Sequence, residues 1–206
     1  MGSVTDGGDA GAIDAGRHIA SSTVGVVLRY VRRVAGSAAV VRVLDIAGLP
    51  PDDPRPEDPG AWVTYPEAVR VFEAAAEVTG DDDVAVRAGE ELLAQYAGSE
   101  VAALLRSLGS PLAVIENVAV TVSKFSTVIT AAMVDSPNGG ALVEARAVPP
   151  FERSPHFCKY MAGVLSQATA LFGLPPAPVV EVECQRRGDD RCLYHVELEP
   201  PDTDDA

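Results

Sequence analysis

The sequence has few basic residues, few aromatic residues and few cysteines, and it contains no long hydrophobic run. It holds 16 Lys and Arg against 30 Asp and Glu, which gives a formal net charge of −14 at pH 7. Because nucleic-acid binding depends on Lys and Arg neutralising phosphate charge, this balance argues against nucleic acid as a partner. No apolar stretch approaches the roughly 20 residues that a membrane-spanning helix needs, and the N-terminus lacks the pattern of a signal peptide. We therefore expect a cytoplasmic protein without a membrane span.

Cysteine occurs only three times in 206 residues. An odd number this small cannot form a disulfide framework and favours a reducing compartment. Hydrophobic residues, in contrast, make up 47% of the chain, which is enough to bury a core and too many for a disordered chain. At about 100–200 residues per domain, the length suggests one domain or two small ones.

Both ends of the chain differ from its middle. Residues 1–21 are rich in Gly, Ala, Ser and Asp without sustained periodicity, and residues 199–206 (EPPDTDDA) are acidic. Such segments bury too little apolar surface to offset the entropy lost on ordering. We predict disordered tails over 1–21 and 199–206 and a single domain over 22–198. This domain has a helical part, 22–123, and a second part, 124–198.

Apolar periodicity, caps and stop signals in the first part predict a series of helices. Their expected ranges are about 24–35, 37–47, 64–79, 82–96, 99–108 and 110–123. The third of them opens with Thr64-Tyr65-Pro66-Glu67, which has the pattern of a capping box.

The second part changes to the alternating pattern of strands. Runs at 125–135 and 141–147 flank an Asn-Gly turn and predict a hairpin. A helix over about 154–173 follows, and then a second hairpin over 179–185 and 191–197. The order helices, hairpin, helix, hairpin predicts an α+β fold in which a helical bundle packs on a small antiparallel sheet.

All three cysteines lie in the last quarter of the chain. Cys158 falls on the predicted long helix, and Cys184 and Cys192 lie on the two strands of the last hairpin. A helix packed on that hairpin could bring the three sulfurs together. Converging thiolates are typical of zinc sites, which accept a carboxylate as a further ligand. The alternative is that these are ordinary buried cysteines, which pack as small hydrophobic side chains.

The last hairpin carries a family resemblance. It resembles the closing hairpin of 4-vinyl reductase-type domains, the C-terminal half of sensor modules in phenol- and xylene-responsive activators of the NtrC class. In those sensors zinc is held by a helix Cys, a Glu three residues before a strand Cys, and a Cys eight residues further on. The resemblance therefore implies zinc ligation by Cys158, Glu181, Cys184 and Cys192. The matching segment is Val180-Glu181-Val182-Glu183-Cys184-Gln185-Arg186-Arg187-Gly188-Asp189-Asp190-Arg191-Cys192.

The position of Glu181 conflicts with this assignment. Strict alternation along a strand places Glu181 and Cys184 on opposite faces. Glu181 can join the site only if the strand begins after it or contains a bulge. Otherwise His156 or water is the expected fourth ligand.

Over roughly residues 24–198 the chain is also similar to the superfamily that unites vinyl reductase-like domains, Bet3-type trafficking subunits and haem-based nitric-oxide sensors. This similarity implies a ligand pocket between the helices and the sheet. The haem ligands of the sensors have no counterpart, because no histidine lies between His18 and His156 and the Tyr-x-Ser-x-Arg propionate clamp is absent. We therefore expect no haem.

Seven apolar residues could line such a pocket, and they are equally suited to a solid core. No Ser/His/Asp or Cys/His arrangement has a recognisable motif, so we do not expect an enzyme. The candidate pocket residues are Val118, Val122, Phe125, Ile129, Met133, Met161 and Leu165.

These observations predict a sensory domain that binds a small hydrophobic molecule, apolar or aromatic, and contains a structural zinc site. It would regulate an output module or a partner, or act as a homodimer. One alternative is a protein–protein interaction module of the Bet3 type without a functional ligand. A second is an accessory role in tetrapyrrole metabolism, which the family name suggests but no acid–base constellation supports.

Overall fold

The computed structural model describes residues 16–96, 98–137 and 139–198. The α-helices are α1 (Ser21–Ala35), α2 (Ser37–Ile46), α3 (Tyr65–Thr79), α4 (Val84–Tyr96), α5 (Glu100–Ser107), α6 (Pro111–Glu116), α7 (Val118–Ser123) and α8 (Pro155–Ala170). The strands are β1 (Ile19–Ala20), β2 (Trp62–Val63), β3 (Ile129–Asp135), β4 (Gly140–Ala147), β5 (Val179–Glu183) and β6 (Cys192–Glu197), and short 3-10 helices are η1 (Arg55–Glu57) and η2 (Gln185–Arg187). The predicted α+β fold is confirmed.

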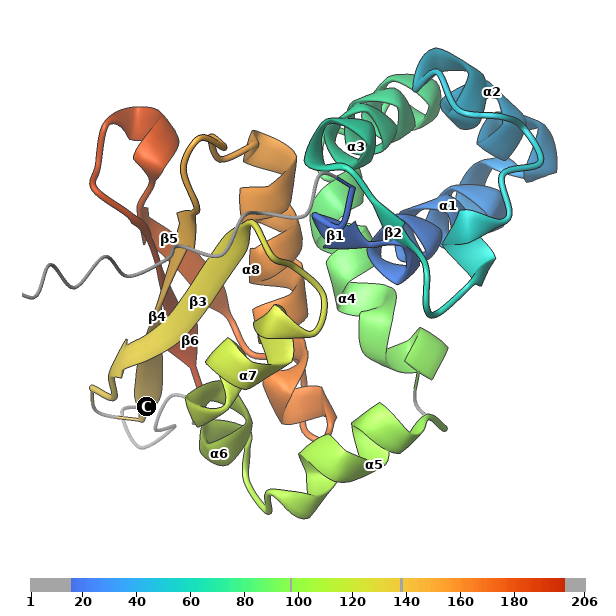
Figure 1. Ribbon diagram of the computed structural model, residues 1–206. Helices are drawn as coiled ribbons and strands as arrows, with labels where there is room; N and C mark the ends of the chain where they lie inside the picture. The colour runs from blue at the N-terminus through green and yellow to red at the C-terminus, as the bar shows by residue number, and fades with distance from the viewer. Residues whose placement is uncertain (1–15, 97, 138, 199–206) are drawn as a thin grey trace, which may run out of the picture.

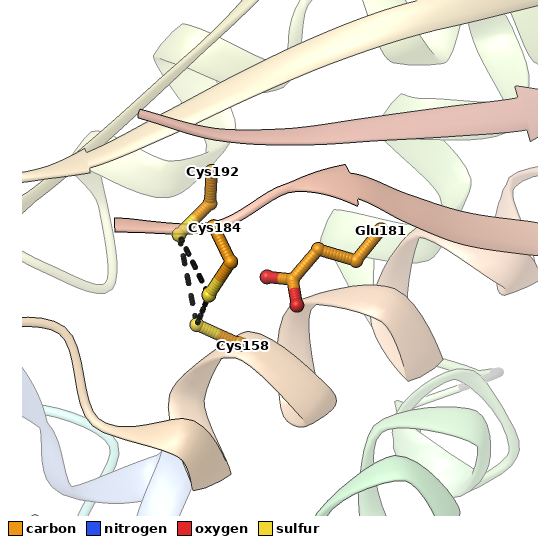
Figure 2. Close-up of side chains that lie close together, drawn as sticks. All are labelled: Cys158, Glu181, Cys184 and Cys192. Carbon is orange, nitrogen blue, oxygen red and sulfur yellow. Dashed lines mark hydrogen bonds between the residues drawn. The ribbon is translucent and has the colours of Figure 1, made fainter. Parts of the chain in front are cut away.

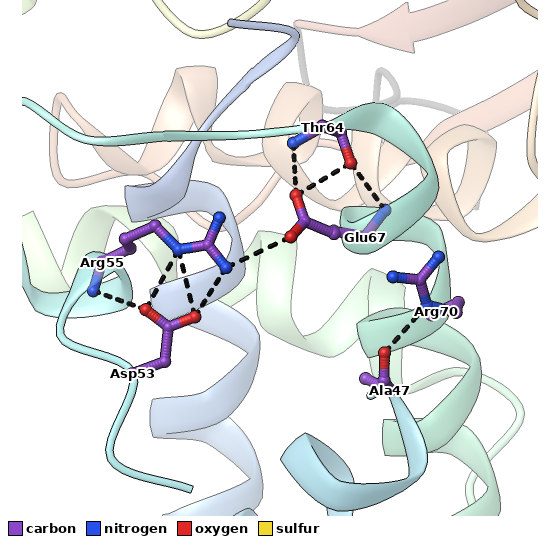
Figure 3. Close-up of polar contacts among 6 residues, drawn as sticks. All are labelled: Ala47, Asp53, Arg55, Thr64, Glu67 and Arg70. Atoms are coloured by element: carbon purple, nitrogen blue, oxygen red, sulfur yellow. Dashed lines mark hydrogen bonds and ion pairs between the residues drawn. The ribbon is translucent and has the colours of Figure 1, made fainter. Parts of the chain in front are cut away.

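The predicted capping box at the start of α3 is present (Figure 3). The Thr64 hydroxyl accepts a hydrogen bond from the backbone N–H of Glu67, and the Glu67 carboxylate accepts one from the backbone N–H of Thr64. These two bonds satisfy backbone donors that have no partner within the first turn of a helix. Arg55 lies between Asp53 and Glu67 and ties the preceding loop to this cap. Further along α3, Arg70 donates to the carbonyl of Ala47 at the end of α2.

Helix α8 lies between the sheet and the helices α1–α4 (Figure 1). Its two faces therefore belong to two hydrophobic clusters. Phe157 faces the cluster formed with α1–α4, whereas Cys158 and Leu165 face the cluster formed with the sheet. Burial of apolar side chains in each cluster stabilises the elements around it, and α8 is the element that the two clusters share.

Two glycines allow α8 to approach α4 closely. A Cβ atom on Gly163 would lie 2.2 Å from the carbonyl oxygen of Val86, and a Cβ on Gly89 would lie 2.6 Å from that of Tyr160. Only hydrogen fits at these positions, so the two backbones pack directly against each other.

The larger sheet is antiparallel with strand order β3-β4-β6-β5. Side chains on one face point toward α8 and are mostly small or apolar, because the helix covers that face. Paired residues on this face include Ala145 with Cys192, and Tyr194 with both Val143 and Glu181. The pairing of β5 with β6 shifts register between Glu181 and Glu183, so Val182 is the extra residue of a β-bulge.

Two sequence-based boundaries need correction. The predicted tail 1–21 extends too far, because Ile19–Ala20 form β1, which pairs with β2 and is buried. Residues 1–15 and the predicted tail 199–206 lie outside the described residues. The predicted helix 110–123 is divided at Asn117 into α6 and α7. Within the described segments, none of the helices is long and apolar enough to cross a membrane.

Candidate metal centre

The four predicted metal ligands lie together where α8 meets the last hairpin (Figure 2). Cys158 sits in the first turns of α8, whose start is fixed by Ser154 as N-cap and by Pro155. Cys184 directly follows β5, and Cys192 is the first residue of β6. The helix and both arms of the hairpin therefore supply sulfurs to one place.

The bulge at Val182 resolves the conflict over Glu181. One extra residue between Glu181 and Glu183 shifts the alternation by one position, so Glu181 and Cys184 face the same side of the sheet. The bulge was one of the two conditions under which Glu181 could join the cysteines. The alternative donor His156 is not one of the four residues that the structure brings together.

The ligand atoms of the cluster lie within 4.8 Å of one another. The sulfur of Cys158 is 3.9 Å from that of Cys184 and 3.7 Å from that of Cys192, and the remaining pair is 3.9 Å apart. These distances are far longer than the roughly 2.05 Å of a disulfide bond, and all three cysteines are free and buried. The Oε1 atom of Glu181 is buried without a hydrogen-bond partner.

The thiols influence one another electrostatically. The hydrogen bond to Cys192, together with burial, raises the pKa of Cys158. The same hydrogen bond lowers the pKa of Cys192, against the effect of burial. Burial raises the pKa of Cys184. Cys192 is therefore the sulfur at which negative charge is best stabilised, and a cation at the centre would favour the thiolate form of all three.

The turn between Cys184 and Cys192 is held by hydrogen bonds from its own residues. The backbone N–H of Cys184 donates to the Asp189 carboxylate at 2.7 Å, and the N–H of Arg187 donates to the Cys184 carbonyl at 2.7 Å. These bonds fold residues 184–189 into a compact loop and fix the direction of the Cys184 side chain.

Two further residues beside the cluster were missed by the sequence analysis. Arg153 is 3% exposed and Tyr194 is fully buried, and the Arg153 guanidinium donates to the Tyr194 hydroxyl at 3.1 Å. The alternation of β6 could have placed Tyr194 on the same face as Cys192. No sequence signal marks Arg153, which lies in the irregular segment before α8.

The seven candidate pocket residues are distributed over both hydrophobic clusters. Ile129 packs in the cluster of α1–α4, whereas Val118 and Leu165 are buried in the cluster under the sheet. Met133 and Met161 pack against the edge of the second cluster, Val122 contacts both, and Phe125 is half-buried.

Two surface cavities lie elsewhere, and neither is lined by any of these seven residues. One, of about 500 Å³, lies over the outer side of the last hairpin, beside Arg146 and Arg191. The other, of about 300 Å³, lies between α1 and η1, beside Arg29 and Glu57.

The arrangement of helices and sheet is that of H-NOX domains. The chain is similar to a Cs H-NOX mutant that carries the unnatural amino acid 4-cyano-L-phenylalanine, with a TM-score of 0.68 and 17% identity over 89% of this chain and 98% of that one. It is also similar to an H-NOX protein of S. oneidensis in the Fe(II)NO ligation state, with a TM-score of 0.65 and 16% identity over 85% of this chain and 99% of that one. The predicted likeness to haem nitric-oxide sensors is thus confirmed for the fold.

The sequence itself identifies the family. Residues 38–196 match the family described as the arabinose-binding domain of AraC transcription regulator, N-terminal. The chain therefore belongs to that family. No curated protein is similar to it in sequence. The finer resemblance to vinyl reductase-type and Bet3-type domains stays a prediction.

The expectation that the chain carries no haem is contradicted by these comparisons. Similar structures include one described as probing heme distortion in the H-NOX family, with a TM-score of 0.66 and 16% identity over 89% of this chain and 96% of that one. The sequence argument relied on one missing histidine and one missing motif. That argument was too narrow, because cysteine and tyrosine also serve as axial ligands of haem iron. In this chain the Nδ1 atom of His156, buried without a hydrogen-bond partner, also has the chemistry of such a ligand.

Proposed function

We propose that this chain is a small-molecule sensory domain in which a structural zinc ion joins the last hairpin to α8. Cys158, Glu181, Cys184 and Cys192 would hold the ion. The observation that carries the zinc proposal is the convergence of these four side chains, from three separate segments, within 4.8 Å.

The distances between the sulfurs support tetrahedral coordination of a single ion. With Zn–S bonds of about 2.3 Å, two ligands at tetrahedral positions lie about 3.8 Å apart. The three sulfur pairs are separated by 3.7 to 3.9 Å. The free Oε1 atom of Glu181 supplies the fourth donor. Four protein ligands leave no open coordination position, so we propose a structural role and no enzymatic activity.

Metal analysis tests the zinc site. Protein purified without added metal should contain about one zinc per chain, and Cys158→Ser and Glu181→Gln should each lower this content. Glu183→Gln is the matched control, because Glu183 lies on the same strand but pairs with Arg191 at 2.9 Å outside the cluster. Less than about half an equivalent in the wild type would refute the zinc site. An absorption spectrum of the same sample measures haem directly.

The sensory part of the proposal is supported by the family, whose description names arabinose binding and a transcription regulator. We propose that the ligand lies between the sheet and the helices α6–α8 and that it is apolar or aromatic. The apolar cluster on this side of α8 supports that chemical class. Binding would favour one conformation over another and so regulate an output module, a partner or a second copy of the chain.

Thermal unfolding with candidate ligands tests the sensory proposal. A ligand at 100 times its Kd stabilises the folded state by about 2.7 kcal/mol, which raises the Tm. The panel should contain arabinose beside small aromatic and aliphatic compounds. A rise with aromatic compounds alone supports the proposal, and a rise with arabinose alone contradicts the proposed ligand class. Native mass spectrometry of the same samples reports the oligomeric state.

One observation favours a second candidate, a protein–protein interaction module. Six of the seven candidate pocket residues pack within or against the two hydrophobic clusters, and neither described cavity reaches them. An interaction module would show no thermal shift with any small molecule, while a partner protein would stabilise it.

A further inference from the structure

Arg153 is a buried cation without an anionic partner among the described residues. It is 3% exposed, its Nε and Nη1 atoms have no hydrogen-bond partner, and the described part of the chain places no carboxylate within ion-pair distance of it. Burying a charge without compensation is strongly unfavourable. The position of Arg153 therefore points to a negative charge close by, which thiolates around a bound metal ion would supply.

The structure fixes Arg153 in place through two tyrosines. The Tyr65 hydroxyl contacts the backbone on both sides of Arg153, because it donates to the carbonyl of Glu152 and accepts from the N–H of Ser154, each at 2.9 Å. The Tyr194 hydroxyl accepts from the guanidinium at 3.1 Å and lies 3.4 Å from the carbonyl oxygen of Cys158. The charge is therefore held next to the backbone of a cluster residue.

The pKa of Arg153 is consistent with this placement. Burial alone would lower the pKa of the guanidinium, but the acidic groups of Tyr194, Cys158 and Cys192 outweigh burial and raise it. The guanidinium is joined to the backbone of Cys158 through the Tyr194 hydroxyl, and all three residues are buried, so screening between the charge and the cluster is weak.

We infer that Arg153 is the counter-charge of the metal centre and sets its affinity for divalent ions. The inference rests on the proposed zinc site. Three thiolates and one carboxylate around a divalent ion leave two negative charges inside the protein. Arg153 compensates one of them. It acts through the ligands as a positioning residue and does not bind the metal itself, in the way that outer-shell groups tune metal sites.

The test is a titration of the metal-free protein with Co²⁺ and Zn²⁺ in competition with a chelator. Arg153→Met, which keeps much of the volume but not the charge, should bind both ions about 10-fold or more weakly, as is typical for loss of an outer-shell partner. Arg153→Lys, which keeps the charge, should recover most of the affinity. Arg191→Met is the matched control, because Arg191 also adjoins a cysteine but pairs with Glu144 and Glu183 on the outer side of the sheet.

Stability separates a counter-charge from a merely structural residue. Without metal, Arg153→Met should be at least as stable as the wild type, because it removes an uncompensated buried charge. With metal, it should gain less stability than the wild type does. If Arg153→Met does not fold, Tyr194→Phe replaces it, and a loss of affinity of about threefold or more supports the inference.

The outcomes distinguish the inference from the proposed function. A wild type that takes up no metal refutes the zinc site. A wild type that binds one equivalent, together with an Arg153→Met or Tyr194→Phe variant of unchanged affinity, leaves the zinc site intact and overturns the role of Arg153. An Arg153→Met variant that loses the same amount of stability with and without metal also overturns the proposed role of Arg153.

Discussion

Asp53 and Arg55 illustrate how single residues stabilise the loop before α3. The Asp53 side chain is 4% exposed and pairs with Arg55 at 2.7 Å, and Arg55 also reaches Glu67 of the capping box (Figure 3). The hydrogen bonds from Arg55 lower the pKa of Asp53 below its ordinary value of 3.8. Loop, cap and helix are therefore linked through one guanidinium.

Asp53→Asn should lower the free energy of unfolding at neutral pH by about 1 kcal/mol, because it removes a charge-assisted hydrogen bond. A carboxylate whose pKa is lower in the folded state stabilises that state above its unfolded-state pKa. This contribution is lost as the pH falls through the folded-state pKa. The difference between variant and wild type should therefore shrink below about pH 4.

Urea unfolding at a series of pH values measures this difference. The control is Asp52→Asn, which changes an exposed neighbour and should have an effect within about 0.5 kcal/mol. A difference between Asp53→Asn and wild type that stays constant down to about pH 2 would contradict the assigned role of the ion pair.

The position of Glu181 shows where sequence reasoning stops at this scale. The residue types and intervals of the four ligands could be read from the chain, and the structure brings all four together. Whether Glu181 faced the cysteines depended on a single extra residue, Val182, in the pairing of β5 with β6. Bulges depend on the partner strand, so the strand's own sequence left both faces possible.

At the scale of elements, the crossing of α4 and α8 depends on glycine. Both helices interrupt good helical sequence with Gly89 and Gly163 at the points where their backbones meet. Elsewhere in a helix such glycines would be unfavourable by about 1 kcal/mol relative to alanine. At this crossing they allow α8 to sit close to α4 while its other face contacts the sheet.

Gly163→Ala should therefore destabilise the protein, although alanine has a higher helix propensity than glycine. We expect a loss of about 1–3 kcal/mol, the usual range for overpacking, because the new Cβ would lie 2.2 Å from the carbonyl oxygen of Val86. Thermal and urea unfolding measure it. Gly60→Ala, where a Cβ meets nothing closer than 3.4 Å, should be nearly neutral. A more stable Gly163→Ala would show that the helices can separate at little cost.

Helices and strands were predictable from the sequence where a local signal, such as a cap or a glycine, marks both of their ends. The capping box and Gly80 bound α3 in both sequence and structure. Residues 19–20 and 62–63 form strands only because they meet each other, and two-residue strands carry no periodicity. The division of the helix over 110–123 at Asn117 was also missed, because no Gly or Pro marks that position.

At the scale of the whole molecule, two hydrophobic clusters share α8, and the cysteine cluster lies on the sheet side of that helix. Removal of the proposed zinc ion should therefore act unevenly. With excess chelator, amides of β5, β6 and the start of α8 should lose hydrogen-exchange protection, whereas those of α1–α3 should keep theirs.

Hydrogen exchange followed by mass spectrometry measures the protection of the sheet side and of helices α1–α3 separately. Cys158→Ser is the control, because the chelator should change nothing in a protein that no longer holds the ion. Uniform loss of protection in the wild type would mean that the sheet side and helices α1–α3 unfold as one unit. Unchanged protection after addition of the chelator would count against the metal site.

The spacing of the cysteines has a consequence for the length of the connections between them. Cys158 and Cys192 are 34 positions apart, and an ion that joins them in the folded protein closes a loop whose closure costs about 4 kcal/mol of chain entropy. This value grows only with the logarithm of loop length. The connection between α8 and β5 can therefore gain or lose several residues with almost no change in this contribution.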